Sequence, residues 1–292
     1  MGEVSDPAFV QLPDPATAFA TRAARLAALA EGSPLAPYLL FLSRVVAVQH
    51  EAQAVLPRPG LPPEARIEQR LGNAMPPLAR EDLSESEGFA EALEWIARHA
   101  AVAGAPAATE QARESLLAMA WPERLLLADA IFNGSYPAEY LGEGLYVAAA
   151  LQVHLARQAA QLDPARLKPV GDGVCPVCGN MPVASVIVGW ANASRARYCC
   201  CALCGTMWNY VRIKCTSCGS TADISYFLIE EQSKDVAVET CAACRGYIKH
   251  FHQHRDARIE PFADDIASMG LDVLVREEDF RRTGINPLMV IS

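Results

Sequence analysis

The sequence lacks any long apolar run. No uncharged stretch reaches about 18 residues, the length that spans a bilayer as a helix. Segment 34–56 comes closest, but Arg44, His50 and Glu51 interrupt it. We therefore expect no membrane-spanning helix and no stable insertion into a membrane.

Basic charge is also scarce. The chain has 25 Lys and Arg against 34 Asp and Glu, a formal net charge of −9 over its 292 residues. The negative excess lies in residues 1–165, whereas the rest is balanced. Proteins that bind nucleic acids generally display an excess of Lys and Arg. The composition therefore argues against nucleic acid as a partner.

Familiar catalytic and targeting motifs are missing as well. There is no Gly-rich phosphate loop, no Gly-x-Ser-x-Gly and no His-Glu-x-x-His. Residues 1–15 are acidic and contain proline, without the basic and then apolar pattern of an export signal. We expect a cytoplasmic protein that is not an enzyme. In that reducing compartment, clustered cysteines bind metal more often than they form disulfides.

Cysteine, by contrast, is abundant, and eight of the ten cysteines form four Cys-x-x-Cys pairs. The pairs are Cys175/Cys178, Cys201/Cys204, Cys215/Cys218 and Cys241/Cys244. The first two pairs are separated by 22 residues, and so are the last two; a shift of 40 residues superimposes one unit on the other. A duplicated supersecondary unit is the simplest explanation.

This spacing predicts two metal sites with four sulfur ligands each. A two-residue spacer lets one tight turn direct both sulfurs to one point, and the 22-residue gap suffices for a β-hairpin. Glycine, which tolerates positive φ, follows the second cysteine in three pairs as Gly179, Gly205 and Gly219; Arg245 follows in the fourth. We expect the first pair to share a metal with the second, and the third pair with the fourth. A cross-braced arrangement of the same eight cysteines is the alternative, and the duplication of a self-contained unit disfavours it.

The identity of the metal is open at this stage. Four thiolates suit zinc and also a single iron of the rubredoxin type. A site with protein sulfur at all four positions leaves no room for substrate or an activated water, which argues against hydrolysis. The two remaining cysteines, Cys199 and Cys200, precede Cys201. Alternation along a strand places Cys199 on the face of Cys201 and Cys200 on the other. They are either small apolar core residues or thiols that act beside the metal.

The fold class that follows is α+β. Residues 1–165 are rich in Ala, Leu, Glu and Arg and predict an all-helical domain. Residues 166–212 and 213–255 predict two tandem ribbons of small antiparallel β-structure, and 256–292 predict a C-terminal helix and tail. The expected helices start at Asp14-Pro15 and near Leu35, and then cover 85–103, 107–120, 122–132, 137–162 and 261–279. Prolines at positions 57, 59, 62, 63, 76 and 77 mark loops between helices. The expected strands cover 183–190, 195–201, 207–213, 224–230, 236–240 and 247–252.

Two further groups of side chains have alternative interpretations. His250, His252 and His254 alternate along an expected strand, where they either ligate a third metal or lie on a solvated face. Tyr198 and Trp208 flank the second pair of cysteines and are either core aromatics or anchors for a partner. Arg197, Arg212 and Lys214 lie near them and could contribute a docking patch.

Several segments resemble the FdhE family of accessory proteins for formate dehydrogenase maturation. They are RYCCCALCGTMW at 197–208, VRIKC at 211–215, ADD at 263–265 and INP at 285–287. The resemblance implies that the eight paired cysteines bind metal, with rubredoxin-like iron as well as zinc-ribbon geometry. It also implies a cytoplasmic chaperone that binds the catalytic subunit of a respiratory, molybdenum-containing formate dehydrogenase. The rival interpretations are a rubredoxin-like electron carrier and a zinc-ribbon adaptor. The sequence leaves open whether the protein forms a homodimer.

Overall fold

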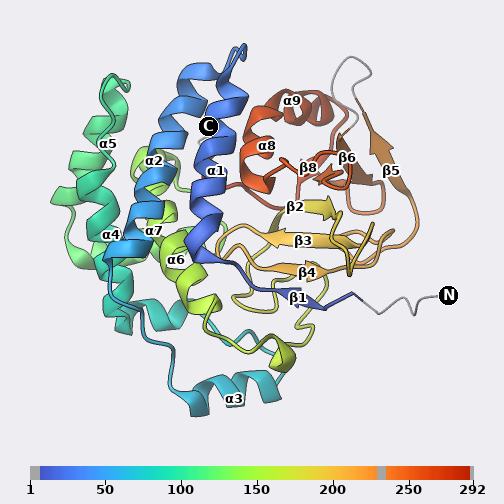
Figure 1. Cartoon of the computed structure of the whole chain (residues 1–292), viewed down its shortest axis with the longest axis horizontal. Helices are drawn as coiled ribbons and strands as arrows, with labels where there is room; N and C mark the ends of the chain where they lie inside the picture. The colour runs from blue at the N-terminus through green and yellow to red at the C-terminus, as the bar shows by residue number, and fades with distance from the viewer. Residues whose placement is uncertain (1–6, 229–234, 290–292) are drawn as a thin grey trace.

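The structure, a computed structural model, describes residues 7–228 and 235–289. Helices from the first half of the chain lie on one side, and a single sheet lies on the other (Figure 1). Two further helices from the C-terminal part lie beside that sheet, close to the N-terminal helices. Within the described residues, no helix combines the length and the apolar character needed to cross a bilayer. The expected class, helical first and β-ribbon second, is confirmed.

The N-terminal part contains seven α-helices in the described residues. They are α1 (Pro15–Ala30), α2 (Ala36–Val55), α3 (Glu64–Gly72), α4 (Glu87–His99), α5 (Ala107–Ala118), α6 (Trp121–Phe132) and α7 (Leu141–Ala159); single 3₁₀ segments cover Arg80–Glu85, Ala138–Tyr140 and Pro164–Arg166. Asp14 caps α1 as expected, because its carboxylate accepts a hydrogen bond from the Ala16 amide at 3.1 Å. Helix α3 was not predicted; it lies between the loops that the prolines at 57–63 and 76–77 mark. That helix buries only Ile67, so its apolar pattern is weak.

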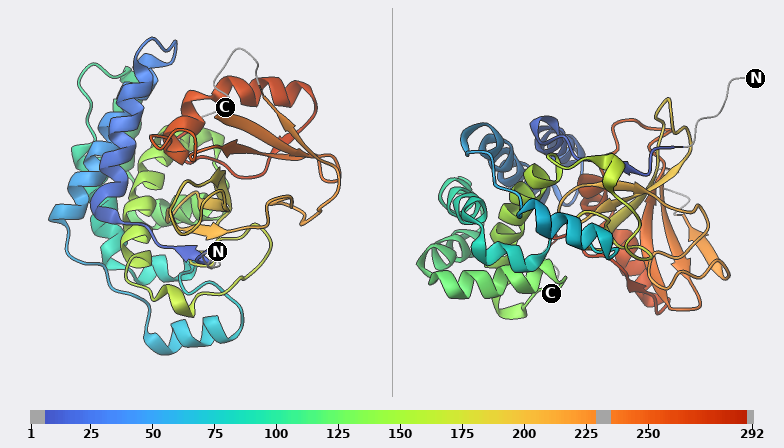
Figure 2. Two further views of the ribbon diagram at one scale, coloured as in Figure 1. Left: turned by 45° about the vertical axis from the view of Figure 1, so that its right-hand side comes forward. Right: turned by 90° about the horizontal axis from the view of Figure 1, so that it is seen from below.

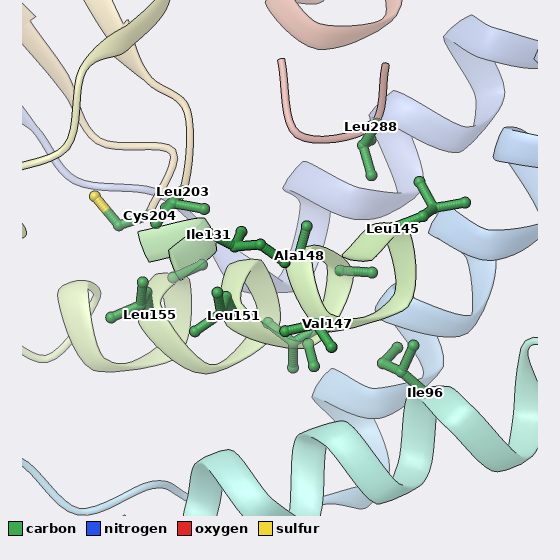
Figure 3. Close-up of a cluster of buried hydrophobic side chains, with 14 of the residues drawn as sticks. Ile96, Ile131, Leu145, Val147, Ala148, Leu151, Leu155, Leu203, Cys204 and Leu288 are labelled. Atoms are coloured by element: carbon green, nitrogen blue, oxygen red, sulfur yellow. The ribbon is translucent and has the colours of Figure 1, made fainter. Parts of the chain in front are cut away.

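Helix α7 is the centre of the helical part. Nearly all of its side chains are buried, as the wide apolar surface of this segment predicts. Figure 3 shows Leu151 and Leu155 on α7 close to Leu203 and Cys204, which belong to the second cysteine pair. The helical core and the first cysteine group therefore share one apolar interior.

The strands form two antiparallel ribbons that are joined in one sheet. The first ribbon contains β2 (Pro182–Ile187), β3 (Arg197–Cys201) and β4 (Met207–Asn209); the second contains β5 (Ile224–Phe227), β6 (Val236–Cys241) and β7 (Gly246–Phe251). The sheet order is β1-β4-β3-β2-β7-β6-β5, with β1 (Val10–Gln11) at one end and β8 (Arg281–Arg282) paired to β7. The parallel pairing of β2 with β7, with Ser185 opposite His250, joins the ribbons. The end of the predicted strand 224–230, residues 229–230, lies outside the described residues.

The expected C-terminal helix is divided in two. Helix α8 (Pro261–Ala267) is followed by its C-cap Ser268 and then by α9 (Met269–Glu277). The Ser268 hydroxyl donates to the Asp264 carbonyl at 2.6 Å, a local bond that competes with continued helix. Ion pairs then fix α8 to α1: Arg22 lies 3.0 Å from Glu260, and Arg25 lies 2.6 Å from Asp264.

Candidate metal centres

The eight paired cysteines converge in two groups of four. Within each group all four sulfur atoms lie within 4.8 Å of one another. Centre 1 is defined by Cys175, Cys178, Cys201 and Cys204, and centre 2 by Cys215, Cys218, Cys241 and Cys244. The first pair thus meets the second and the third meets the fourth, so the sulfurs are not cross-braced.

The sulfur distances fit a tetrahedral metal ion. In centre 1 the Cys175 and Cys204 sulfurs are 3.6 Å apart, and those of Cys178 and Cys201 are 3.4 Å apart. The corresponding separations in centre 2 are 3.7 and 3.8 Å. Four sulfurs at about 2.3 Å from a central metal are about 3.8 Å apart, whereas a disulfide bond is about 2.05 Å long. Each group could therefore hold one metal ion.

The duplicated turns have the same hydrogen bonds. The Gly179 amide donates to the Cys175 carbonyl at 2.9 Å, and the Val177 amide lies 3.4 Å from the Cys175 sulfur. In centre 2 the Gly219 amide donates to the Cys215 carbonyl at 3.1 Å, and the Ser217 amide lies 3.3 Å from the Cys215 sulfur. Amides directed at sulfur favour the thiolate, which is the form that binds metal.

Arg245, which replaces glycine after the fourth pair, adopts the same backbone conformation. Its φ is +58°, against +72° for Gly205 and Gly219. This left-handed conformation costs a non-glycine residue about 1 kcal/mol or more. Side-chain contacts compensate: the guanidinium lies 4.0 Å from the centroid of the Phe280 ring and donates to the Glu278 carbonyl at 2.5 Å.

The two centres differ in their exposure to solvent. Every sulfur residue of centre 1 is at most 2% exposed, whereas Cys218 and Cys244 of centre 2 are exposed. The helical part covers centre 1 directly, because the Leu78 amide donates to the Val177 carbonyl at 3.0 Å. Within the described residues, solvent and partner proteins therefore have direct access to centre 2 and not to centre 1.

Burial has an electrostatic consequence at centre 1. Desolvation, together with hydrogen bonds from the neighbouring thiols, raises the pKa of Cys175 well above its ordinary value. Four thiolates in this apolar interior need a cation to compensate their charge. At centre 2, by contrast, the backbone amide of Ser220 holds the pKa of the Cys218 thiol below its usual range. The donor set of both centres therefore fits a divalent or trivalent metal.

Cys199 and Cys200 alternate as predicted. Cys199 lies in the same apolar cluster as Cys201, whereas Cys200 packs in a different cluster with Phe251 and Phe262. Both thiols are buried, and desolvation raises the pKa of Cys199 to about 12. Such a thiol is a weak nucleophile. The environment agrees with the interpretation of apolar core residues.

The three histidines do not form a metal site. His250 is buried on β7, and its Nδ1 lies 3.1 Å from the Ser185 hydroxyl. His252 and His254 lie beyond the end of β7, and successive rings meet edge-on at 5.1 and 5.4 Å. Across residues 7–228 and 235–289, only the two cysteine groups bring three or more metal-ligating side chains together. The structure therefore does not support a third metal, and the alternative of a solvated face is wrong for His250, which is 4% exposed.

Neither Arg197 nor Trp208 contributes to a docking patch, and the interpretation of Tyr198 and Trp208 as core aromatics is confirmed. All three side chains are 1–2% exposed, and Trp208 pairs with Val10 of β1. Arg197 instead extends into the second ribbon, where its Nη2 donates to Glu239 at 2.8 Å. The two residues are 42 positions apart, so nothing local in the sequence indicates the pair.

Comparison with known proteins covers the whole described chain. The family model "FdhE, N-terminal" matches residues 7–172. The model "FdhE, central domain" matches residues 174–212, and "FdhE, C-terminal domain" matches residues 213–289. A protein FdhE homolog from Rhizobium meliloti (strain 1021) is 40% identical over 99% of this chain and 95% of the relative. Another, from Edwardsiella ictaluri (strain 93-146), is 34% identical over 95% of this chain and 90% of the relative.

A solved structure agrees with these sequence matches. The crystal structure of the FdhE protein from Pseudomonas aeruginosa superimposes with a TM-score of 0.85 at 30% identity, covering 97% of this chain and 99% of that one. The likeness therefore includes the helical part, both cysteine groups and the C-terminal helices. The chain belongs to the FdhE family.

Proposed function

We propose that this protein is an accessory factor that binds the catalytic subunit of a respiratory, molybdenum-containing formate dehydrogenase in the cytoplasm during its maturation. The observation that carries the proposal is the match to the FdhE family over nearly the whole chain, which supports an accessory role in formate dehydrogenase maturation. In residues 7–228 and 235–289 no arrangement of side chains suggests catalysis, and we propose that the protein acts by binding rather than as an enzyme.

The eight cysteines of centres 1 and 2 are the metal ligands in this proposal, and the metals are zinc or iron. A bound metal supplies cross-linking of the turns and, if it is iron, one-electron chemistry. Four protein sulfurs complete each coordination shell, so neither metal binds substrate. We further propose four structural units: residues 1–165, 166–212, 213–255 and 256–292. The two ribbons then form a rigid platform for the client.

The test is complementation in a host that respires formate and lacks its own FdhE. The tagged protein is expressed, formate dehydrogenase activity is assayed, and the eluate is analysed for catalytic subunit and metal. Restored activity, recovered subunit and about two metals per chain are expected. The ligand variant Cys218→Ser should lose metal from centre 2, whereas the matched control Ser217→Ala, an exposed neighbour, should retain it. Failure to restore activity or to recover the subunit contradicts the proposal.

The exposure of Cys218 and Cys244 favours a rubredoxin-like electron carrier as the second candidate. An exposed iron at centre 2 would exchange electrons with a partner over a short distance. This candidate requires coloured iron that is reversibly reduced. A colourless zinc protein that still restores formate dehydrogenase activity excludes it.

A further inference from the structure

Strand β5 forms an open edge of the sheet. It is the last strand in the sheet order, next to β6, and in the described part of the chain no strand pairs with its outer side (Figure 1). Natural edge strands are usually protected by charged side chains, proline or a bulge. The sequence of β5, Ile224-Ser225-Tyr226-Phe227, has neither charge nor proline. Its outward backbone groups can therefore pair with an added strand.

A pocket lies between the end of β5 and helix α9. Its volume is about 240 Å³, and its apolar lining consists of Phe227, Leu228, Leu271, Leu274, Val275 and Phe280. Phe227 is 44% exposed, Leu228 52% and Leu274 48%. The left view of Figure 2 shows the red C-terminal helices directly above the orange strands of the second ribbon. An exposed apolar patch of this kind, beside an open strand edge, is typical of a site for another protein.

The charged residues that line the pocket are both acidic. Its two remaining lining residues, Glu277 and Glu278, are exposed carboxylates at the end of α9 and immediately after it. Within residues 7–228 and 235–289 neither carboxylate has an ion-pair partner; the nearby Arg245 guanidinium lies over the Phe280 ring and donates to the backbone carbonyl of Glu278, not to its carboxylate. A ligand that places an apolar side chain in the pocket and a basic side chain beside it would match both features.

Centre 2 holds this edge in place. Ile224 of β5 is paired with Cys241, a cysteine of centre 2, and Phe227 is paired with Val238 along the same ladder. A strand already ordered by its neighbour loses less conformational freedom when a peptide binds. The edge, the pocket and centre 2 therefore form one preorganised surface.

We propose that the β5 edge and the adjoining pocket bind an extended segment of a partner protein that contains apolar side chains and at least one basic residue. The segment adds as a strand to β5, places an apolar side chain against Leu228 and Leu274, and directs its basic side chain to Glu277. This inference rests on the proposed function, because the partner that carries the segment is the client subunit.

The test uses two fluorescent ten-residue peptides and the full-length metal-loaded protein. Both peptides alternate Val and Leu with polar residues; one carries two Arg, and the other carries Glu at those positions. Fluorescence anisotropy should show at least tenfold tighter binding of the basic peptide, and hydrogen exchange should show new protection of β5 amides. Equal affinity for both peptides, or protection elsewhere only, overturns the proposal.

Variants make the result specific to this surface. Leu274→Asp and Glu277→Lys should each weaken binding of the basic peptide at least tenfold. The matched control Leu126→Asp, on α6 where Leu126 is 72% exposed, should bind as the wild type does. Melting temperature and metal content serve as checks of folding. If the wild type dimerises through β5 and Leu274→Asp is monomeric, a second copy is the occupant and the proposal fails.

The complementation experiment separates this inference from the proposed function. If the wild type does not recover the catalytic subunit, the proposed function fails, irrespective of the affinities measured for the two peptides. If the wild type and Leu274→Asp recover the subunit equally, the function stands and the β5 surface is excluded as its docking site.

Discussion

Replacement of Arg197 should uncouple the two ribbons. The Arg197 side chain is completely buried and belongs to β3 of the first ribbon, whereas its partner Glu239, 3% exposed, belongs to β6 of the second. Its Nη1 also lies 3.1 Å from each of three carbonyl oxygens, those of residues 211, 212 and 214 in the segment between the ribbons. Arg197→Met keeps much of the volume and removes the charge and every donor.

The expected loss is about 3–5 kcal/mol of folding free energy, because removal of one partner leaves a buried charge uncompensated. For a chain of this size that corresponds to a fall in melting temperature of roughly 6–10 °C. The hydroxyl of Tyr226, 2.9 Å from Glu239, remains as a hydrogen-bond donor and limits the loss. The double variant Arg197→Met/Glu239→Gln should be more stable than Arg197→Met alone, since no charge is then left buried.

The pH dependence has a definite sign. Burial raises the pKa of Glu239, and the positive charge of Arg197 opposes that rise. Without Arg197 the pKa rises further. A carboxyl with a raised pKa in the folded state favours folding at low pH and loses that contribution as pH rises. The deficit of Arg197→Met should therefore grow between pH 5 and pH 8, measured by thermal unfolding beside the double variant. A deficit below about 1 kcal/mol at pH 7.5, or one independent of pH, refutes the reasoning.

Three other measurements follow from the structure. A chelator should remove the metal of centre 2 first, because Cys218 is exposed whereas centre 1 is buried; a colorimetric indicator should record two separate phases, and a single phase contradicts this. Burial lowers the pKa of His154 to about 4, so stability present above pH 6.5 should fall as pH drops toward 4, and His154→Leu should reduce that fall in thermal unfolding. Gly173→Ala should cost at least about 2 kcal/mol, because φ is +64° and the added Cβ would lie 1.7 Å from the Thr216 carbonyl oxygen. Gly60→Ala, with open space around it, is the control in denaturant unfolding and should be close to neutral.

Local patterns predicted much of the fold and of the candidate site. The duplication of the Cys-x-x-Cys units predicted the grouping of centre 1 and centre 2, because each unit contains two pairs and a 22-residue gap that suffices for a hairpin. The Asp14 cap follows from residue type at a helix start, and the broad apolar surface of α7 follows from the helical period. The alternation of Cys199 and Cys200 follows from the two-residue period of a strand. Helix α3 escaped this reasoning, since only Ile67 marks a buried face.

The sequence by itself determined the two four-cysteine units and the helical first half, because these depend on contacts between residues close together or repeated at a fixed period. Tertiary structure decided that the ribbons share one sheet, through the pairing of Ser185 with His250, 65 residues apart. It also decided that helices cover centre 1 and leave Cys218 exposed, and that Arg197 is buried rather than displayed. Such outcomes depend on which surfaces exclude water together. The spacing of the cysteines is the same in both units, so the spacing alone does not record this difference.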